Sequence, residues 1–141
     1  ATSRAAEDIG TPIMDQLACG ELIARHDDVL TPRRDVLRRR RGALLDAVGE
    51  ALPDWRVESP PGGLSMWLRM PAPVSTALAA VAPAHGGVVA AGPRFGVEGA
   101  FEHYMRLPFT ESSDRIREAV HRLASAYRTL DPAAGAPRMV L

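Results

Sequence analysis

One segment of this sequence, residues 113–130, has a strong helical period. The apolar and aromatic residues in it recur at steps of four and three, and they are Ile116, Val120, Leu123, Tyr127 and Leu130. This spacing places them on one face of an α-helix that begins after a cap at Ser112 or Ser113. An amphipathic helix of this kind is stable mainly because its apolar face packs against another element. The rest of the chain therefore has to provide an apolar surface for it.

Two segments with the period of a β-strand provide such a surface. Residues 64–70 and 104–109 each alternate large apolar residues with other types, which places the apolar set on one face of a sheet. These apolar positions are Leu64, Met66 and Leu68 in the first segment and Met105, Leu107 and Phe109 in the second. Shorter strands are predicted at 55–57 and 88–90.

Helical patterns flank these strands. A partial helical period covers residues 13–29, and Thr31-Pro32 predicts the start of a second helix that runs to Leu52. A short third helix follows a predicted cap at Ser75. The order helix, helix, β, β, helix, β, β, helix indicates an α+β fold, a two-layer sandwich. We expect this domain to cover residues 13–131. It is preceded by a lead-in segment, residues 1–12, and followed by a tail, residues 132–141.

The length of 141 residues is that of one ordinary domain. No run approaches the roughly 20 apolar residues that a membrane span needs, and no signal peptide is visible. The start at Ala1, without a methionine, suggests a processed or excised piece. The single cysteine, Cys19, cannot form an internal disulfide, which predicts a cytoplasmic location. The 17 basic and 17 acidic residues cancel, which argues against a broad nucleic-acid surface.

All 17 basic residues are arginine, so the chain contains no lysine. It therefore supplies no Schiff-base lysine, phosphate-loop lysine or lysine general base. The most prominent charge run is Arg38-Arg39-Arg40-Arg41, and one interpretation is a phosphate or nucleic-acid contact. However, four successive residues point around about 400° of a helix, so they do not face one ligand. We interpret the run as a solvated helix face.

Two constellations remain as candidate sites. Gly62 and Gly63 enter the strand at 64–70, and paired glycines let a ligand or another backbone come close, although spacing alone favours an ordinary turn. The second candidate is Arg106, which the strand period places opposite the apolar face. Its planar fork of donors suits a carboxylate, and a salt bridge to Glu102 or Glu98 is an equally good interpretation.

Taken together, the motifs resemble the C-terminal small domain of fold-type I pyridoxal-phosphate enzymes, the aspartate aminotransferase superfamily. After the long arginine-rich helix from Pro32 to Leu52, the resemblance is carried by five motifs in order: Leu52-Pro53-Asp54-Trp55, Pro61-Gly62-Gly63-Leu64-Ser65-Met66-Trp67, Gly86-Gly87-Val88-Val89, Gly92-Pro93-Arg94-Phe95 and Met105-Arg106-Leu107-Pro108-Phe109. The final amphipathic helix completes the set, which covers roughly residues 11–130. Two of the pieces, Arg94-Phe95-Gly96 and Arg106-Leu107-Pro108-Phe109, are most similar to the aminotransferase-like effector domain of MocR-type regulators in the GntR family.

This resemblance implies a small, mostly antiparallel sheet covered by helices, and it assigns roles to residues. Arg106 matches the arginine that binds the substrate α-carboxylate. The turn at Gly62 and Gly63 would line the substrate side of the cleft, and Arg94 and Phe95 would lie nearby. No catalytic residue and no metal site are expected in this chain.

The resemblance also implies what lies outside the chain. Pyridoxal phosphate would be held by a larger parent protein, because this chain has no lysine to bind it covalently. The expected partners are an N-terminal large domain, an amino acid or a pyridoxal-phosphate adduct, and a second copy in a homodimer. DNA would be contacted only through a separate N-terminal domain, and no membrane is involved. Gly86-Gly87 departs from the family pattern by one extra glycine.

Three functions follow as hypotheses. The first is the C-terminal part of the effector domain of a GntR/MocR-type transcriptional regulator, which contributes the carboxylate-binding Arg106 and is not catalytic alone. The second is the small domain of a pyridoxal-phosphate-dependent aminotransferase. The third is a free-standing α+β interaction module.

Overall fold

The computed structural model describes residues 12–58 and 60–130. The chain divides into two units, Ala1–Val36 and Leu37–Leu141. Apart from Pro12, the predicted lead-in segment and the predicted tail lie outside the described residues. None of the described helices has the length and apolar character needed to cross a membrane.

The first unit contains α2, Ile13–Ala24, and the beginning of α3, His26–Ala51. The predicted helix start at Thr31-Pro32 is wrong, because Pro32 lies inside α3. Asp27 and Asp28 lie in the first turn of α3, where carboxylates interact favourably with the helix dipole. A proline within a helix removes one backbone hydrogen bond, but it does not always end the helix. A Thr-Pro pair therefore does not by itself locate a helix start.

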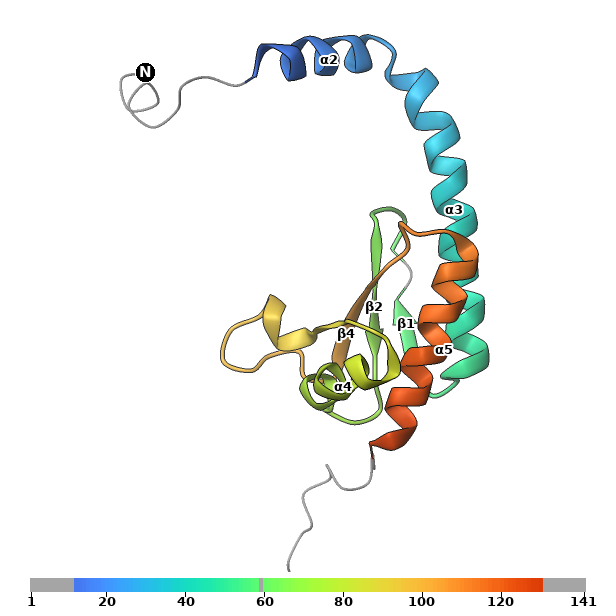
Figure 1. The fold of residues 1–141 in the computed structure, drawn as a ribbon, viewed down its shortest axis with the longest axis vertical. Helices are drawn as coiled ribbons and strands as arrows, with labels where there is room; N and C mark the ends of the chain where they lie inside the picture. The colour runs from blue at the N-terminus through green and yellow to red at the C-terminus, as the bar shows by residue number, and fades with distance from the viewer. Residues whose placement is uncertain (1–11, 59, 131–141) are drawn as a thin grey trace, which may run out of the picture. The chain divides into compact units, whose positions relative to one another are not determined.

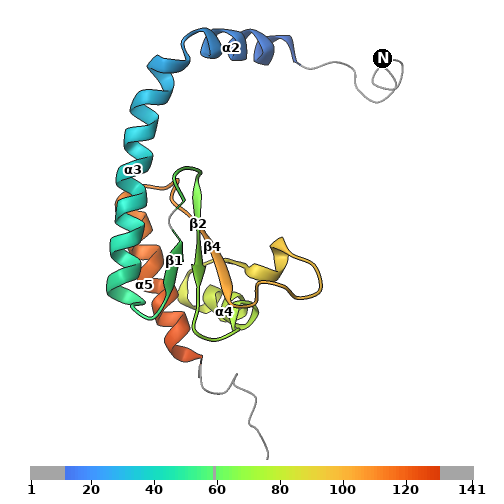
Figure 2. The same ribbon diagram turned by 180° about the vertical axis from the view of Figure 1, so that it is seen from behind.

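The second unit is built on an antiparallel sheet with the strand order β1-β2-β4-β3 (Figures 1 and 2). The strands are β1 (Arg56–Glu58), β2 (Ser65–Arg69), β3 (Ala90–Ala91) and β4 (Tyr104–Pro108). In the central pair, Met66 lies opposite Leu107 and Trp67 lies opposite Arg106.

Two helices cover one face of this sheet. The C-terminal half of α3 and the whole of α5, Ser113–Thr129, lie side by side against it (Figures 1 and 2). The core between them includes Leu44 and Val48 of α3, Ile116, Val120 and Leu123 of α5, and Met66, Leu68, Met105 and Leu107 of the sheet. The predicted stripe of α5 therefore faces the core, and Ser112 caps this helix by accepting a hydrogen bond from the Arg115 N–H. The predicted α+β sandwich is confirmed.

A third helical segment connects β2 to β3 in the sequence. It comprises α4 (Ser75–Val81) and the 3₁₀ turn η1 (Ala82–His85). The predicted cap at Ser75 is wrong, because the Ser75 side chain is buried and its Oγ accepts a hydrogen bond from Gly92 N at 3.3 Å. Glu102 takes the capping role from a distant part of the chain. Its carboxylate accepts hydrogen bonds from Thr76 N at 2.7 Å and from Thr76 Oγ1 at 2.8 Å.

Two further expectations need correction. The strand predicted at 88–90 is displaced to Ala90–Ala91, and Val88 is 93% exposed. The arginine run is not a fully solvated face. Arg40 donates to the Thr110 carbonyl, and Arg41 Nη1 donates to the Pro60 carbonyl at 2.8 Å. These two half-buried side chains tie α3 to the segments that enter β2 and leave β4, because each satisfies a backbone acceptor there.

Candidate functional site

Arg106 lies at the centre of the sheet, on β4 between β2 and β3. Its neighbours Met105 and Leu107 are buried in the core, whereas Arg106 is exposed. Successive residues of a strand point to opposite faces, so the guanidinium stands on the face opposite α3 and α5. The strand period of 104–109 predicts this orientation.

Two contacts hold the Arg106 side chain. Its Nε donates a hydrogen bond to Ser65 Oγ at 2.8 Å, and its Cζ lies 5.3 Å from the centre of the Phe95 ring. The hydrogen bond uses the inner edge of the guanidinium, and the aromatic face attracts the cation. Within residues 12–58 and 60–130, the two terminal nitrogens of Arg106, Nη1 and Nη2, have no hydrogen-bond or ion-pair partner.

The alternative interpretation, a salt bridge from Arg106 to Glu102 or Glu98, is not what the structure shows. Among residues 12–58 and 60–130, no carboxylate lies within ion-pair distance of Arg106. Glu102 binds Thr76 at the start of α4 instead. Glu98 lies in the loop before β4 with a φ of 54°.

An open cleft of about 350 Å³ surrounds the guanidinium. It is lined by Ser65, Val88, Val89, Ala90, Arg94, Phe95, Arg106, Leu107 and Pro108. The structure thus brings together three residues singled out from the sequence, Arg94, Phe95 and Arg106. The lining contains two guanidinium groups and no carboxylate, so the cleft suits an anion.

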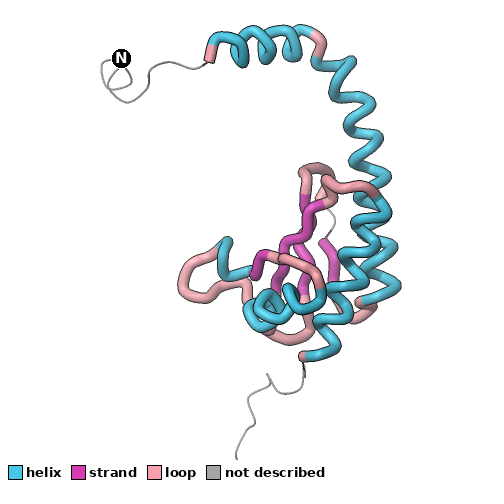
Figure 3. The backbone as a smooth tube through the Cα atoms, in the orientation of Figure 1, coloured by secondary structure: helices cyan, strands magenta, loops and turns pink. Residues whose placement is uncertain are grey.

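Phe95 and Arg94 belong to η2, the 3₁₀ turn Gly92–Phe95, whose position depends on glycine at 92. A Cβ at Gly92 would lie 1.9 Å from the Phe101 carbonyl oxygen and 2.6 Å from that of Tyr104. Such distances are far below van der Waals contact, so only glycine lets these backbones approach. Residues 96–103 then form a loop that projects from the sheet (Figure 3).

An aromatic cluster centred on Trp67 lies on this face and reaches Arg106 through Phe95. Two of its members, Trp67 and Phe101, were not predicted as site residues. The Trp67 ring centre lies 5.3 Å from Phe95, 5.6 Å from Phe101 and 6.0 Å from Tyr104. The strand alternation of residues 64–70 could have identified Trp67, because it places this residue on the face of the sheet opposite the buried Met66. Nothing in the local sequence pairs Phe101 with it.

Gly62 and Gly63 lie in the turn before β2, and neither lines the cleft. Gly63 has a φ of +99°, a conformation that other residues rarely adopt, so the turn requires glycine for its backbone. A Cβ added at Gly62 or at Gly63 would have no neighbouring atom within 4 Å.

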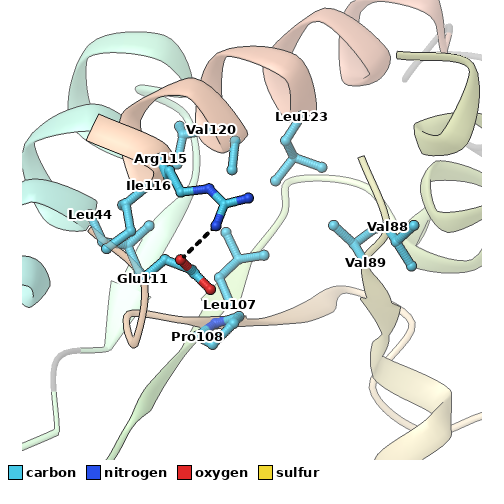
Figure 4. Close-up of a pocket in the computed structure, with 11 residues that line it drawn as sticks. Leu44, Val88, Val89, Leu107, Pro108, Glu111, Arg115, Ile116, Val120 and Leu123 are labelled. Carbon is cyan, nitrogen blue, oxygen red and sulfur yellow. Dashed lines mark hydrogen bonds and ion pairs between the residues drawn. The ribbon is translucent and has the colours of Figure 1, made fainter. Parts of the chain in front are cut away.

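A smaller hollow of about 150 Å³ lies between α5 and the sheet (Figure 4). Its walls are apolar and include Leu44, Leu107, Val120 and Leu123, while an ion pair of 3.2 Å between Glu111 and Arg115 stands at its edge. Val88 and Val89 line both this hollow and the cleft. Apart from the ion pair, the hollow offers no polar side chain that could bind a charged ligand.

Other reactive groups lie away from the cleft. Tyr127 packs edge-on against Trp55, with ring centres 5.2 Å apart, and burial raises the pKa of its hydroxyl. In the described part of the chain, no group of three His, Cys, Asp or Glu residues is placed to hold a metal. The residues present do not fit pyridoxal phosphate as a covalently bound group, because the chain has no lysine.

Comparisons with known proteins agree with this architecture, although no known family profile matches the sequence. The chain is 33% identical over 101 residues to the LL-diaminopimelate aminotransferase of Oleidesulfovibrio alaskensis, an alignment that covers 70% of this chain and 25% of that protein.

Solved structures give the same result. The α-aminoadipate aminotransferase LysN of Thermus thermophilus, crystallised with N-(5'-phosphopyridoxyl)-L-leucine, superposes with a TM-score of 0.81 and 26% identity over 91% of this chain and 34% of that one. A multiple substrate aminotransferase from Thermococcus profundus superposes with a TM-score of 0.62 and 31% identity over 67% of this chain and 24% of that one.

The chain thus spans about a quarter to a third of the length of these relatives. Its sheet and covering helices match a small domain in their structures. The chain is homologous to part of the fold-type I pyridoxal-phosphate-dependent aminotransferases, and its fold is that of their small domain.

Proposed function

We propose that this chain is the small domain of a pyridoxal-phosphate-dependent aminotransferase and that Arg106 binds the carboxylate of its amino-acid substrate. The observation that carries the proposal is the state of the Arg106 guanidinium. It is fixed at Nε by Ser65, it stands in an open cleft, and no acidic group of the described chain neutralises it.

This geometry suits end-on recognition of a carboxylate. Because Ser65 occupies Nε, the edge formed by Nη1 and Nη2 is available for two parallel hydrogen bonds to the two carboxylate oxygens. Phe95 lies against the guanidinium and restricts its rotation, so less conformational entropy is lost on binding. In this proposal Arg106 orients the substrate, and the reacting atoms lie elsewhere.

The cofactor enters the proposal only through the parent protein. No lysine of this chain is available to bind pyridoxal phosphate covalently, so the amine that does so would come from a large domain. No chemical step is assigned to residues of this chain.

A regulatory role is a second candidate, favoured by the similarity of Arg94-Phe95-Gly96 and Arg106-Leu107-Pro108-Phe109 to the effector domain of MocR-type regulators. There, ligand binding at Arg106 would favour one domain arrangement over another, because a ligand shifts a conformational equilibrium only through its differential affinity. A winged helix-turn-helix encoded in the same reading frame would support this candidate. DNA binding by that protein that is unaffected by amino acids would contradict it.

The experiment that tests the carboxylate site compares variants of the full-length parent. Arg106→Gln should weaken amino-acid binding by about 100-fold, since a charge-assisted bidentate contact contributes roughly 2–3 kcal/mol. Arg106→Lys should recover only part of that loss. The matched control is Arg128→Gln, which removes the same charge from the last turn of α5. Affinity is read from the cofactor absorbance during titration, and unchanged affinity in Arg106→Gln would refute the proposal.

A further inference from the structure

We infer that the outer edge of β3, extended through Val88 and Val89, is a docking site for an extended peptide segment that adds to the sheet as a further strand. The occupant is a segment of the parent protein that lies outside these 141 residues. This inference concerns an interaction surface and does not depend on the role proposed for Arg106.

The two edges of the sheet differ in how they are protected from such pairing. In the order β1-β2-β4-β3, the edge strands are β1 and β3. On β1, the exposed charged residues Arg56 and Glu58 flank Val57. Charged side chains on an edge strand disfavour the approach of another strand. Residues 86–91, by contrast, are Gly-Gly-Val-Val-Ala-Ala and contain neither a charge nor a proline. The edge at β3 therefore lacks the protection that β1 has.

The backbone is unpaired just before β3. Gly87 N donates to the Ala82 carbonyl at 3.0 Å, and pairing with β4 begins only at Ala90. Between these two points, the N–H and C=O groups of Val88 and Val89 have no hydrogen-bond partner in the described part of the chain. Unpaired backbone groups along an edge are the donors and acceptors that an added strand uses.

The sequence of β4 explains why pairing stops here. The register sets Ala90 opposite Arg106, so the same register continued by two residues would set Val88 opposite Pro108. Proline has no N–H to donate, so the ladder between β3 and β4 loses a donor at this point. The groups at Val88 can therefore be satisfied only by water or by another strand.

The side chains at this edge are apolar. Val88 is 93% exposed, the largest exposed fraction among the exposed large apolar residues of the described chain. Val88 and Val89 also line the hollow of about 150 Å³ beside α5, whose other walls include Leu107 and Val120 (Figure 4). An added strand would cover Val88 and place an apolar side chain over the mouth of this hollow. Backbone pairing would then provide affinity, and the hollow would select an apolar residue at one position.

The comparisons indicate where such a strand would come from. The chain covers 25% of the LL-diaminopimelate aminotransferase and 34% of LysN, so most of a parent of that length lies outside it. The unpaired edge is short and offers few hydrogen bonds, so its occupancy depends on a high effective concentration. A segment of the same polypeptide provides that concentration, whereas a second copy of this chain does not.

The test compares amide hydrogen exchange in the 141-residue chain with that in the full-length parent. We expect at least one of the Val88, Val89 and Ala90 amides to exchange at least about tenfold more slowly in the parent, because a strand hydrogen bond suppresses exchange until the strand opens. The amides of β1, the charged edge, should exchange equally in both proteins. Equal slowing at both edges would reflect general stabilisation of the domain and would overturn the inference.

A pair of matched variants tests the edge itself. Val88→Lys places a charge on it, and the control is Val97→Lys, which changes a second valine that is 80% exposed. In the 141-residue chain neither variant should alter the unfolding temperature, because both side chains are exposed. In the parent, Val88→Lys should remove the slow exchange at this edge and Val97→Lys should retain it.

The other outcomes each count against the inference. Fast exchange of all three edge amides in the parent would overturn it, and so would slow exchange that survives in Val88→Lys. If slow exchange appeared in the 141-residue chain and increased with protein concentration, the occupant would be a second copy, and the assignment to a segment of the parent would fail.

Discussion

Trp67 and Arg106 lie directly opposite each other in the antiparallel pair of β2 and β4, so both side chains project from the same face of the sheet. The large ring of Trp67 also contacts Phe95, and Phe95 in turn lies against the Arg106 guanidinium. The charged group is thus bordered by aromatic rings on one side and by the hydroxyl of Ser65 on another. This arrangement gives each neighbour of Arg106 a testable role.

Ser65 is a positioning residue for Arg106. Ser65→Ala removes the acceptor of the Nε–H and should weaken carboxylate binding about three- to tenfold, since one such hydrogen bond contributes about 0.5–1.5 kcal/mol. Ser65→Thr keeps the hydroxyl and should restore most of the affinity. The specific readout is the hydrogen exchange rate of the Arg106 Nε–H, which should rise in Ser65→Ala and stay slow in Ser65→Thr. An unaltered exchange rate in Ser65→Ala would show that this bond is not formed in solution.

Gly92 determines whether η2 can reach the sheet. Gly92→Ala places a methyl group 1.9 Å from the Phe101 carbonyl oxygen, and backbone atoms on both sides would have to move. We expect a loss of about 2–4 kcal/mol in the free energy of unfolding, measured by urea denaturation. The matched control is Gly62→Ala, where the added methyl meets nothing within 4 Å, and it should change stability by less than about 0.5 kcal/mol. Equal stabilities for the two variants would contradict this packing.

Tyr127 makes stability depend on pH in alkaline solution. Burial raises the pKa of its hydroxyl in the folded chain, whereas the unfolded chain keeps a value of about 10. The stabilising contribution is therefore complete below pH about 10 and is lost as the pH rises through the folded-state pKa. Tyr127→Phe should show a weaker decline of the unfolding free energy above pH about 10. An identical alkaline profile in both proteins would argue against a buried Tyr127 hydroxyl.

Local periodicity predicts much of this fold. The helical stripe of residues 113–130 and the alternation of 104–109 identify α5 and β4, because one face of each must be buried. The outward direction of Arg106 follows from the same alternation. These features depend on neighbours along the chain, where spacing carries the information.

The sequence pattern could not predict contacts between segments that are far apart in the chain. Ser65 and Arg106 are separated by 41 residues in sequence, and Thr76 and Glu102 by 26. The close approach of Gly92 to Phe101 depends on the path by which the loop of residues 96–103 returns to the sheet. The spacing of glycines in the sequence does not predict that path. Arg40 belongs to a charge run whose pattern looks solvated, yet its partner is a carbonyl beyond β4. Each of these contacts is a tertiary property that overrides the local pattern.

Val88 and Val89, which line both the cleft and the smaller hollow, have a mechanical consequence for the cleft. The smaller hollow leaves about 150 Å³ of unfilled volume next to them, bounded in part by apolar side chains of α5. A wall with space on its far side is compliant, because its side chains change rotamer without displacing a packed core. The cleft can therefore widen at Val88 and Val89 but not at β4. In a series of ligands that differ only in chain length, the affinities should differ less than they would in a rigid cleft.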